Sequence, residues 1–367
     1  MNNLLIGACT ADTHFSAFNP KDQYQILQEQ FIKVIRDYPI LDFILISGDL
    51  YDHKLMGNSD GLLYASMFVD DVVRIAKEKN STVIIIHGTF SHDADQLKNL
   101  YHYMNDKDLD IRIVTSIEFI NVKGSRILCI PELYGVDESI YQNALHYSGY
   151  YDMAFIHGTF EGSVYGNNVG NGRLFTIHDF DMCRGFMIGG HVHTPGCHKG
   201  YFYYTGSPYR WKFGEEEDKG FLTAILDRDT MMHYIQFNVI TSYKYVTIKL
   251  DDIISSDPKA VIEYINRLQK DENIDFLKIK FNVPMEGAKK VVIDNYYRNN
   301  SKTFVEFMDV SEEQKVTQEQ QLISEQYNYL LDNKISDLEK FVMYVNMNEG
   351  GKFITVDKLR ELLEEAV

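Results

Sequence analysis

The 367-residue chain lacks the features that would place it in a membrane. Its longest apolar runs, residues 41–46 and 83–86, are far shorter than the roughly 18 residues that a membrane-spanning helix needs. No basic segment followed by an apolar one opens the chain, so we expect no secretion signal.

Cysteine is also scarce. The chain has four cysteines, Cys9, Cys129, Cys183 and Cys197, and no two of them form a CxxC pair. This scatter is typical of buried or incidental thiols in a reducing compartment. We therefore expect a cytoplasmic location.

Lysine and arginine are too few to balance the acidic residues, 36 against 53, which gives a net charge of −17. Proteins that bind nucleic acid usually carry basic patches, so this total disfavours such a partner. The distribution weakens the objection, because residues 241–304 contain 11 basic and 9 acidic residues. Charge alone therefore decides nothing.

The chain does have a regular alternation of apolar and amphipathic segments over residues 1–150. The pattern predicts strands and helices in turn, with the strands at 4–8, 43–46, 83–87, 112–115 and 126–130 and the helices at 24–37, 61–79 and 95–103. Such alternation indicates an α/β domain in which helices flank sheets. Further apolar runs up to residue 240 predict that the second half of this domain is richer in strands.

The pattern restarts near residue 241. A strand at 245–250, a helix at 258–270 and a strand at 276–281 predict a small α+β module. After residue 305 the chain is polar, acidic and helix-favouring, with apolar stripes that need a surface to bury against. We therefore predict three parts: residues 1–240, 241–305 and 306–367.

Polar side chains follow most of the predicted strands. They lie in six segments, Asp12-Thr13-His14, Gly48-Asp49-Leu50-Tyr51-Asp52, Ser91-His92-Asp93, His157-Gly158, Gly190-His191-Val192-His193 and Gly206-Ser207-Pro208. Loops at strand ends often carry functional side chains, and carboxylates mixed with imidazoles suit two divalent ions such as Mn²⁺. Each segment alone has an ordinary interpretation, since DxH and GDxxD arise by chance or in turns and a lone histidine is more often a core residue. Their joint order favours a two-metal site.

That order resembles the calcineurin-like metallophosphoesterase superfamily, with its DxH, GDxxD, GNHD, H and GHxH blocks. The stretch Gly206-Ser207-Pro208-Tyr209-Arg210-Trp211-Lys212-Phe213-Gly214-Glu215, running on to Lys219-Gly220-Phe221, is similar to SbcD-type nucleases. Those are the nuclease subunits of double-strand-break repair and recombination complexes in cells and phages. The motifs cover residues 1–240. The resemblance implies a four-layer β-sandwich flanked by helices, a small capping domain that binds DNA and a helical C-terminal tail.

The resemblance also implies roles for individual residues. One ion would be held by four side chains, Asp12, His14, Asp49 and His193. The second ion would share one of them and be held by Asp49, Ser91, His157 and His191. His92 would be the catalytic residue beside the scissile phosphate. The ions would be Mn²⁺, with Mg²⁺ as the alternative.

The third block departs from the family pattern. Its asparagine is a neutral oxygen ligand in GNHD, whereas Gly88-Thr89-Phe90-Ser91-His92-Asp93 puts Ser91 in that position. A hydroxyl is a weaker ligand than an amide oxygen, so we expect the second ion to bind less tightly. The remaining candidates for contacts with the substrate or with the ligands are Asp52, His53, Asp93 and Arg210.

The leading interpretation is a Mn²⁺-dependent DNA nuclease, an exonuclease and potentially also an endonuclease, that acts on double-stranded ends or on single strands. The resemblance implies a homodimer that pairs through helix 61–79. It also implies an SbcC-type, SMC-like ATPase that binds the C-terminal helices. Two alternatives stay open: another phosphatase of the same superfamily, and a DNA-tethering subunit with weakened catalysis.

Overall fold

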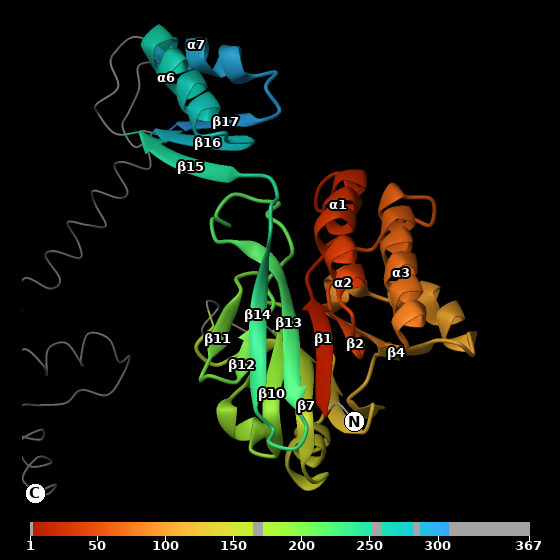
Figure 1. The fold of residues 1–367 in the computed structure, drawn as a ribbon. Coiled ribbons are helices and arrows are strands. Elements are labelled where there is room, and N and C mark those ends of the chain that lie inside the picture. The colour runs from red at the N-terminus through yellow and green to blue at the C-terminus, as the bar shows by residue number, and fades with distance from the viewer. Residues whose placement is uncertain (1–2, 164–171, 251–257, 282–286, 308–367) are drawn as a thin grey trace, which may run out of the picture. The chain divides into compact units, whose positions relative to one another are not determined.

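The computed structural model describes residues 3–163, 172–250, 258–281 and 287–307 (Figure 1). The predicted mixed α/β fold is confirmed, because helices alternate with strands that form two large mixed sheets. The chain divides into two compact units, residues 1–247 with 266–278 and residues 248–265 with 279–367. The predicted tail, 306–367, lies outside the described residues except for its first two.

The first six-stranded sheet has the order β14-β13-β1-β2-β3-β4. Its strands are β1 (Leu4–Thr10), β2 (Phe43–Ser47), β3 (Thr82–Ile86), β4 (Asp110–Val114), β13 (Lys219–Asp227) and β14 (His233–Ile240). The first four run parallel, whereas β13 and β14 form an antiparallel hairpin beside β1. Every residue of β2 and β3 is buried. Such unbroken apolar runs are typical of parallel strands that are covered on both faces.

The second six-stranded sheet has the order β11-β12-β10-β7-β6-β5. Its strands are β5 (Glu118–Val122), β6 (Ser125–Ile130), β7 (Tyr151–His157), β10 (Cys183–Gly190), β11 (Gly196–His198) and β12 (Phe202–Tyr204). Strands β6, β7 and β10 are parallel neighbours. A separate parallel pair is formed by β8 (Thr159–Phe160) and β9 (Leu174–Phe175).

The first helical region begins at Asn19, whose side chain accepts a hydrogen bond from the backbone of Lys21, and Pro20 follows in the first turn. It contains α1 (Pro20–Leu27), the π-helical turn η1 (Gln28–Ile32) and α2 (Lys33–Asp37). The sequence predicted one helix there, at 24–37.

Helix α3 (Asp60–Lys79) begins at the Ser59 cap and ends at Asn80, which has left-handed backbone angles. The shorter helices of this part are α4 (Phe90–Asp93), η2 (Gln96–Asn105), α5 (Glu138–Gln142), η3 (Asn143–Tyr147) and η4 (Ile177–Phe180). Here η2 and η4 are 3₁₀ helices and η3 is a π-helical turn.

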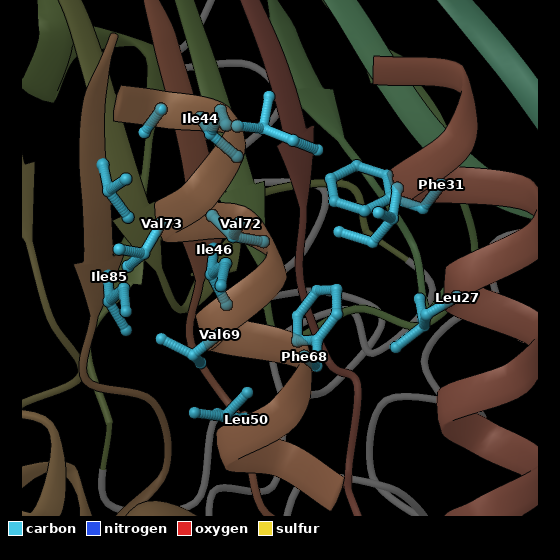
Figure 2. Packing of buried hydrophobic residues seen from close by; sticks show 14 of the residues in the cluster. Leu27, Phe31, Ile44, Ile46, Leu50, Phe68, Val69, Val72, Val73 and Ile85 are labelled. Carbon is cyan, nitrogen blue, oxygen red and sulfur yellow. The ribbon is translucent and has the colours of Figure 1, made fainter. Parts of the chain in front are cut away.

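Three buried apolar clusters hold these elements together. The first joins one face of the first sheet to the helices, with Ile46 of β2 close to Phe68 and Val69 of α3 (Figure 2). The second draws side chains from both sheets, such as Leu45 of β2 and Phe155 of β7. The third lies between the other face of the second sheet and α5 with η3. Burial of these side chains is the main force that fixes the position of the strand ends.

The later residues form a three-stranded sheet of order β15-β16-β17. Its strands are β15 (Tyr245–Leu250), β16 (Phe276–Phe281) and β17 (Thr303–Phe307), and its helices are α6 (Pro258–Asp271) and α7 (Gly287–Tyr297). The predicted strand, helix and strand are therefore present. Within the described ranges no helix combines the length and the apolar character needed to span a bilayer.

Candidate metal centre

Three parallel strands of the first sheet deliver polar side chains to one edge. Asp12 follows β1, Asp49 follows β2 and Thr89 follows β3, and these strands are neighbours in the order β1-β2-β3. The backbone N–H of Asp12 donates to the Gly48 carbonyl at 3.0 Å, and that of His14 donates to the Asp49 carbonyl at 3.0 Å. The first two loops are therefore held together by their own backbones.

The parallel strands of the second sheet also deliver polar side chains to one edge. Glu132 follows β6, His157 ends β7 and His191 follows β10, and these strands are also parallel neighbours. The carboxylate of Asp12 accepts from the backbone N–H of His191 at 3.0 Å with both of its oxygens. Because the carboxyl ends of the parallel strands of both sheets meet, the loops build one cluster.

Seven of the predicted residues come together in this cluster. Their donor atoms form three overlapping groups, each with all donor atoms within 4.8 Å of one another: Asp12 with His14 and His193, His14 with Asp49 and His92, and Asp49 with His157 and His191. The groups share His14 and Asp49. The cluster could therefore hold metal ions, and its overlapping groups offer more than one binding position.

Asp49 lies at the centre. Its Oδ2 atom is 3.3 Å from His157 Nε2 and 3.7 Å from His14 Nε2. Burial alone would raise the pKa of Asp49, but the neighbouring imidazoles of His157 and His14 hold this pKa well below its ordinary value. Asp49 is therefore an ionised carboxylate that faces two different histidines.

His14 and His157 carry buried nitrogen atoms that no protein group satisfies. In His14 both ring nitrogens are buried without a hydrogen-bond partner, and in His157 this is true of Nε2. Buried polar atoms are nearly always paired, so these exceptions need an explanation. Burial lowers the pKa of both imidazoles, but the surrounding carboxylates, Asp49 foremost for His157 and Asp52 for His14, raise it overall. Divalent ions would satisfy one nitrogen of His14 and Nε2 of His157 when the imidazoles are neutral.

Two glycines make room for the His157 ring. A Cβ atom on Gly48 would lie 2.0 Å from His157 Nδ1, and one on Gly190 would lie 2.8 Å from the same atom. Gly48 also has a φ of +88°, in the region that favours glycine. The glycines of these two motifs therefore allow the loops to approach the histidine.

Several cluster residues adopt backbone angles that are rare outside glycine. The φ angle is +51° at Asp12, +42° at His14, +50° at Asp49 and +88° at His191. Positive φ values at residues other than glycine often mark functional sites, where the surrounding structure holds the strain. Here they aim four side chains into one cluster.

A carboxylate, that of Glu215, is hydrogen-bonded to the ring of His193 and orients it. Its Nδ1 atom lies 3.1 Å from Glu215 Oε1, and Trp211 packs 4.6 Å from its ring. Burial would raise the pKa of Glu215, but the hydrogen bond with His193 and the charge of Lys219 lower it. An ionised Glu215 accepts a hydrogen bond from Nδ1–H of His193, which leaves Nε2 as the nitrogen that could bind a metal ion. Carboxylates commonly orient metal-binding histidines in this way.

His92 lies beside His14, with ring centroids 4.6 Å apart and nearly perpendicular planes. Its Nδ1 atom is hydrogen-bonded to the carbonyl oxygen of Asp52. A carbonyl only accepts, so Nδ1 carries the proton and Nε2 is the nitrogen that remains for chemistry. His92 is half-buried, which suits a side chain that reaches solvent or a ligand.

The third motif differs from the sequence prediction. Ser91 is exposed on α4 and makes no hydrogen bond to a cluster residue in the described chain. Thr89 contacts the cluster instead: its N–H donates to Asp49 Oδ1 at 2.6 Å, and its hydroxyl lies 3.2 Å from Asp49 Oδ2. The two extra residues after Gly88 place the threonine, and not the serine, next to the central carboxylate.

Asp93 acts on the backbone around the cluster. Its buried carboxylate accepts from the N–H groups of Gly88 at 2.7 Å, Asp49 at 3.1 Å and Tyr51 at 3.2 Å. Burial and the charge of Asp49 raise the pKa of Asp93. Three backbone hydrogen bonds to one side chain shape the loop that presents Asp49.

The remaining candidates lie at different distances from the cluster. Asp52 Oδ1 is 3.5 Å from His14 Nδ1, and Asp52 Oδ2 is 3.0 Å from the exposed His53. The guanidinium of Arg210 donates to the carbonyls of Glu216 and Glu217 at 3.0 Å. Its guanidinium also lies 3.7 Å from Asp218, so Arg210 contacts the 216–218 loop.

Glu132 is a cluster residue that the sequence reasoning missed. Its Oε2 atom lies 3.3 Å from His191 Nδ1 and 3.6 Å from His157 Nε2, and its side chain is 8% exposed. It also lines a cavity of about 510 Å³, whose wall includes the exposed rings of Phe90 and Tyr134. The signal was available, since Glu132 follows the apolar run that forms β6.

No protein-family profile matches the chain, and no curated protein matches it. Solved structures do match it. One of them, a crystal structure, has a TM-score of 0.39 and 12% sequence identity, and the match covers 64% of this chain and 99% of that chain. This likeness is too weak to support a functional inference.

Proposed function

We propose that the chain is a metal-dependent phosphodiesterase that cleaves DNA, the nuclease subunit of an SbcCD-type complex. The observation that carries the proposal is the convergence of seven predicted residues in three donor groups that share His14 and Asp49. A site for two adjacent ions needs a carboxylate that reaches both of them. The order of the motifs and the burial of side chains between two mixed sheets agree with the metallophosphoesterase resemblance.

The donor set fits divalent ions. In the proposal Asp12, His14 and His193 hold one ion, His157 and His191 hold the second, and Asp49 lies between them. Imidazoles mixed with carboxylates suit Mn²⁺ well, and the ions would satisfy one unpartnered nitrogen of His14 and that of His157. Bound ions would activate a water molecule and offset the negative charge of a phosphoryl group.

His92 is proposed to act on the leaving oxygen. The Asp52 carbonyl holds Nδ1 and so fixes the orientation of the ring. In its protonated form the ring carries a second proton on Nε2, which can be donated to the oxygen that leaves phosphorus. In the same position the imidazolium would stabilise negative charge on the phosphate.

The cavity beside Glu132 favours a nucleic acid over a small phosphomonoester. Phe90, Tyr101 and Tyr134 line it with exposed fractions of 59%, 40% and 39%, and Lys98 lies on the same wall in an ion pair with Asp95. Exposed aromatic rings provide stacking surfaces for nucleobases. A strand whose phosphate lies at the cluster would thus have a place for a neighbouring base.

The predicted partners remain part of the proposal. On α3, Leu63 is 55% exposed, and this side chain is available for the proposed homodimer contact. The apolar stripes proposed to bind an SbcC-type ATPase fall in 308–367, outside the described residues. Binding of that partner is tested by truncation after residue 305, which is expected to abolish it.

The test is cleavage of linear duplex DNA by the full-length chain with Mn²⁺. We expect degradation that needs the ion and falls by about 100-fold or more in His92→Ala, in the range of lost acid–base catalysis. His178→Ala, at an exposed histidine, is the matched control and should retain full activity. Hydrolysis of a generic phosphomonoester without DNA cleavage would favour the phosphatase alternative. Bound Mn²⁺ without either activity would favour the tethering alternative.

A further inference from the structure

We propose that Glu132 is an anionic ligand of the second divalent ion, in the place where the resembled family has the neutral amide of GNHD. The inference rests on the proposed two-ion site and adds to it a residue that no motif contains. It also changes the chemistry of the site, because a third carboxylate joins Asp12 and Asp49.

The topology brings Glu132 to the second ion's histidines. Strands β6, β7 and β10 are adjacent and parallel, and they end at Ile130, His157 and Gly190. Glu132 is the second residue after β6, and its N–H donates to the carbonyl of His87 at 3.3 Å. Because the carboxyl ends of adjacent parallel strands lie at one edge of a sheet, Glu132 lies at the same edge as His157 and His191.

The distances suit ligands of one ion. Two atoms that each lie about 2.1 Å from a cation are about 3.0–3.4 Å apart in octahedral or tetrahedral geometry. Glu132 Oε2 is 3.3 Å from His191 Nδ1, which is within this range, and 3.6 Å from His157 Nε2, which is just beyond it. Asp49 Oδ2 is 3.3 Å from the same His157 nitrogen. His157 Nε2 thus lies between two carboxylate oxygens, and it has no hydrogen-bond partner.

The charge of Glu132 is otherwise poorly matched. Its side chain is 8% exposed, and across the described residues its ion pairs are to His157 and His191, with no lysine or arginine. A buried carboxylate needs a positive partner, and a divalent ion would provide one.

Thr89 explains why the amide can be absent. Its hydroxyl lies 2.9 Å from Glu132 Oε2 and 3.2 Å from Asp49 Oδ2. One hydroxyl has a single proton, so it donates to one carboxylate at a time, and its oxygen lies within hydrogen-bond distance of both. The geometry points to Thr89 as a positioning residue and to Glu132 as the ligand.

The experiment is Mn²⁺ binding to the full-length chain, followed by the electron paramagnetic resonance signal of the free ion. The variants are Glu132→Ala and Glu132→Gln, with Glu78→Gln on the exposed side of α3 as the matched control. We expect two ions per chain in the natural protein and in the control. The second ion should bind about 10-fold more weakly in Glu132→Gln, which keeps a neutral oxygen, and more weakly still in Glu132→Ala.

Two ions bound by Glu132→Ala with affinities within twofold of the natural chain would overturn the inference. If that variant does not fold, Glu132→Gln decides, since unchanged affinity there excludes an anionic ligand. DNA cleavage by the natural chain is measured in parallel. Cleavage with no loss of binding in the variants removes the inference and leaves the proposed function. If the Glu132 variants lose the second ion but the natural chain does not cleave DNA, the inference stands and the proposed function is wrong. If the natural chain binds no Mn²⁺, the inference and the proposed function are both wrong.

Discussion

His157 Nδ1 lies 2.7 Å from the carbonyl oxygen of Ser47, so the last residue of β7 in one sheet is bonded to the last residue of β2 in the other. The hydroxyl of Ser47 donates in return to the carbonyl of Ile156 at 2.7 Å. Because a carbonyl only accepts, the Nδ1 proton is fixed and Nε2 is directed at Asp49. This junction couples the packing of the two sheets to the ligand geometry.

Gly48→Ala should damage both stability and metal binding. The new Cβ would lie 2.0 Å from His157 Nδ1, in a backbone with φ of +88°. Strain and steric conflict of this kind cost roughly 1–3 kcal/mol each. Chemical denaturation measures the loss, with Gly57→Ala as the control because open space surrounds Gly57. Equal stability of the two variants would show that His157 moves freely.

Glu215→Gln should weaken the first ion without unfolding the chain. The carboxylate holds His193 Nδ1 at 3.1 Å, and removal of such partners typically lowers metal affinity about 10–100-fold. Calorimetric titration with Mn²⁺ measures the change. Glu216→Gln is the neighbouring control, since that residue is exposed. If both variants bind Mn²⁺ alike, Glu215 does not orient the ligand.

The metal-free chain should lose stability as the pH rises. The pKa values of His14 and His157 are raised in the folded state, chiefly by Asp52 and Asp49 against the effect of burial. A histidine whose pKa is raised by folding stabilises the folded state. This contribution is complete below the pKa of the unfolded state, about 6.5, and is lost as the pH rises through the pKa of the folded state. Mn²⁺ binds imidazoles only in their neutral form. The increase in folding stability that Mn²⁺ causes should therefore become larger as the pH rises over the same range.

Thermal unfolding between pH 6 and 9, with chelator or with Mn²⁺, tests this linkage. We expect the two melting temperatures to diverge as pH increases, and Mn²⁺ binding to release protons. A constant difference across the range would mean that these histidines do not exchange protons for metal.

Phe90→Ala should impair DNA cleavage more than cleavage of a small phosphodiester. Loss of one base–aromatic contact costs about 1–3 kcal/mol, which would appear in KM for DNA. The ring is 59% exposed and lines the cavity beside Glu132. Tyr147→Ala, at a ring that is 77% exposed and away from that cavity, is the control. The same KM for DNA in both variants would exclude the cavity as a base-binding site.

Much of the fold follows from periodicity. The apolar runs at 43–46 and 83–87 predicted strands, and the buried strands β2 and β3 are present there. The short β5 and the α5 region were not predicted, because each mixes polar and apolar residues over only five positions, unlike the apolar runs of β2 and β3. The break of the first helix at η1 is a local change of hydrogen bonding that apolar spacing does not encode.

The site was predictable where a motif marks it. Asp12, Asp49 and the histidines were placed by strand ends and glycines. Ser91 takes the position of the asparagine in the GNHD block, yet the extra residues after Gly88 turn Thr89 toward Asp49. Glu132 and Glu215 act through partners far away in sequence, and only the packing of two sheets reveals which strand ends meet.

The central claim is that this cluster binds divalent ions, and the fluorescence of Trp211 tests it most directly. Trp211 is the single tryptophan of the chain, and its ring lies 4.7 Å from that of His14 and 4.6 Å from that of His193. Titration with paramagnetic Mn²⁺ should quench its emission saturably, with recovery on addition of chelator. Emission that stays constant while Mn²⁺ rises to millimolar concentration would contradict the account.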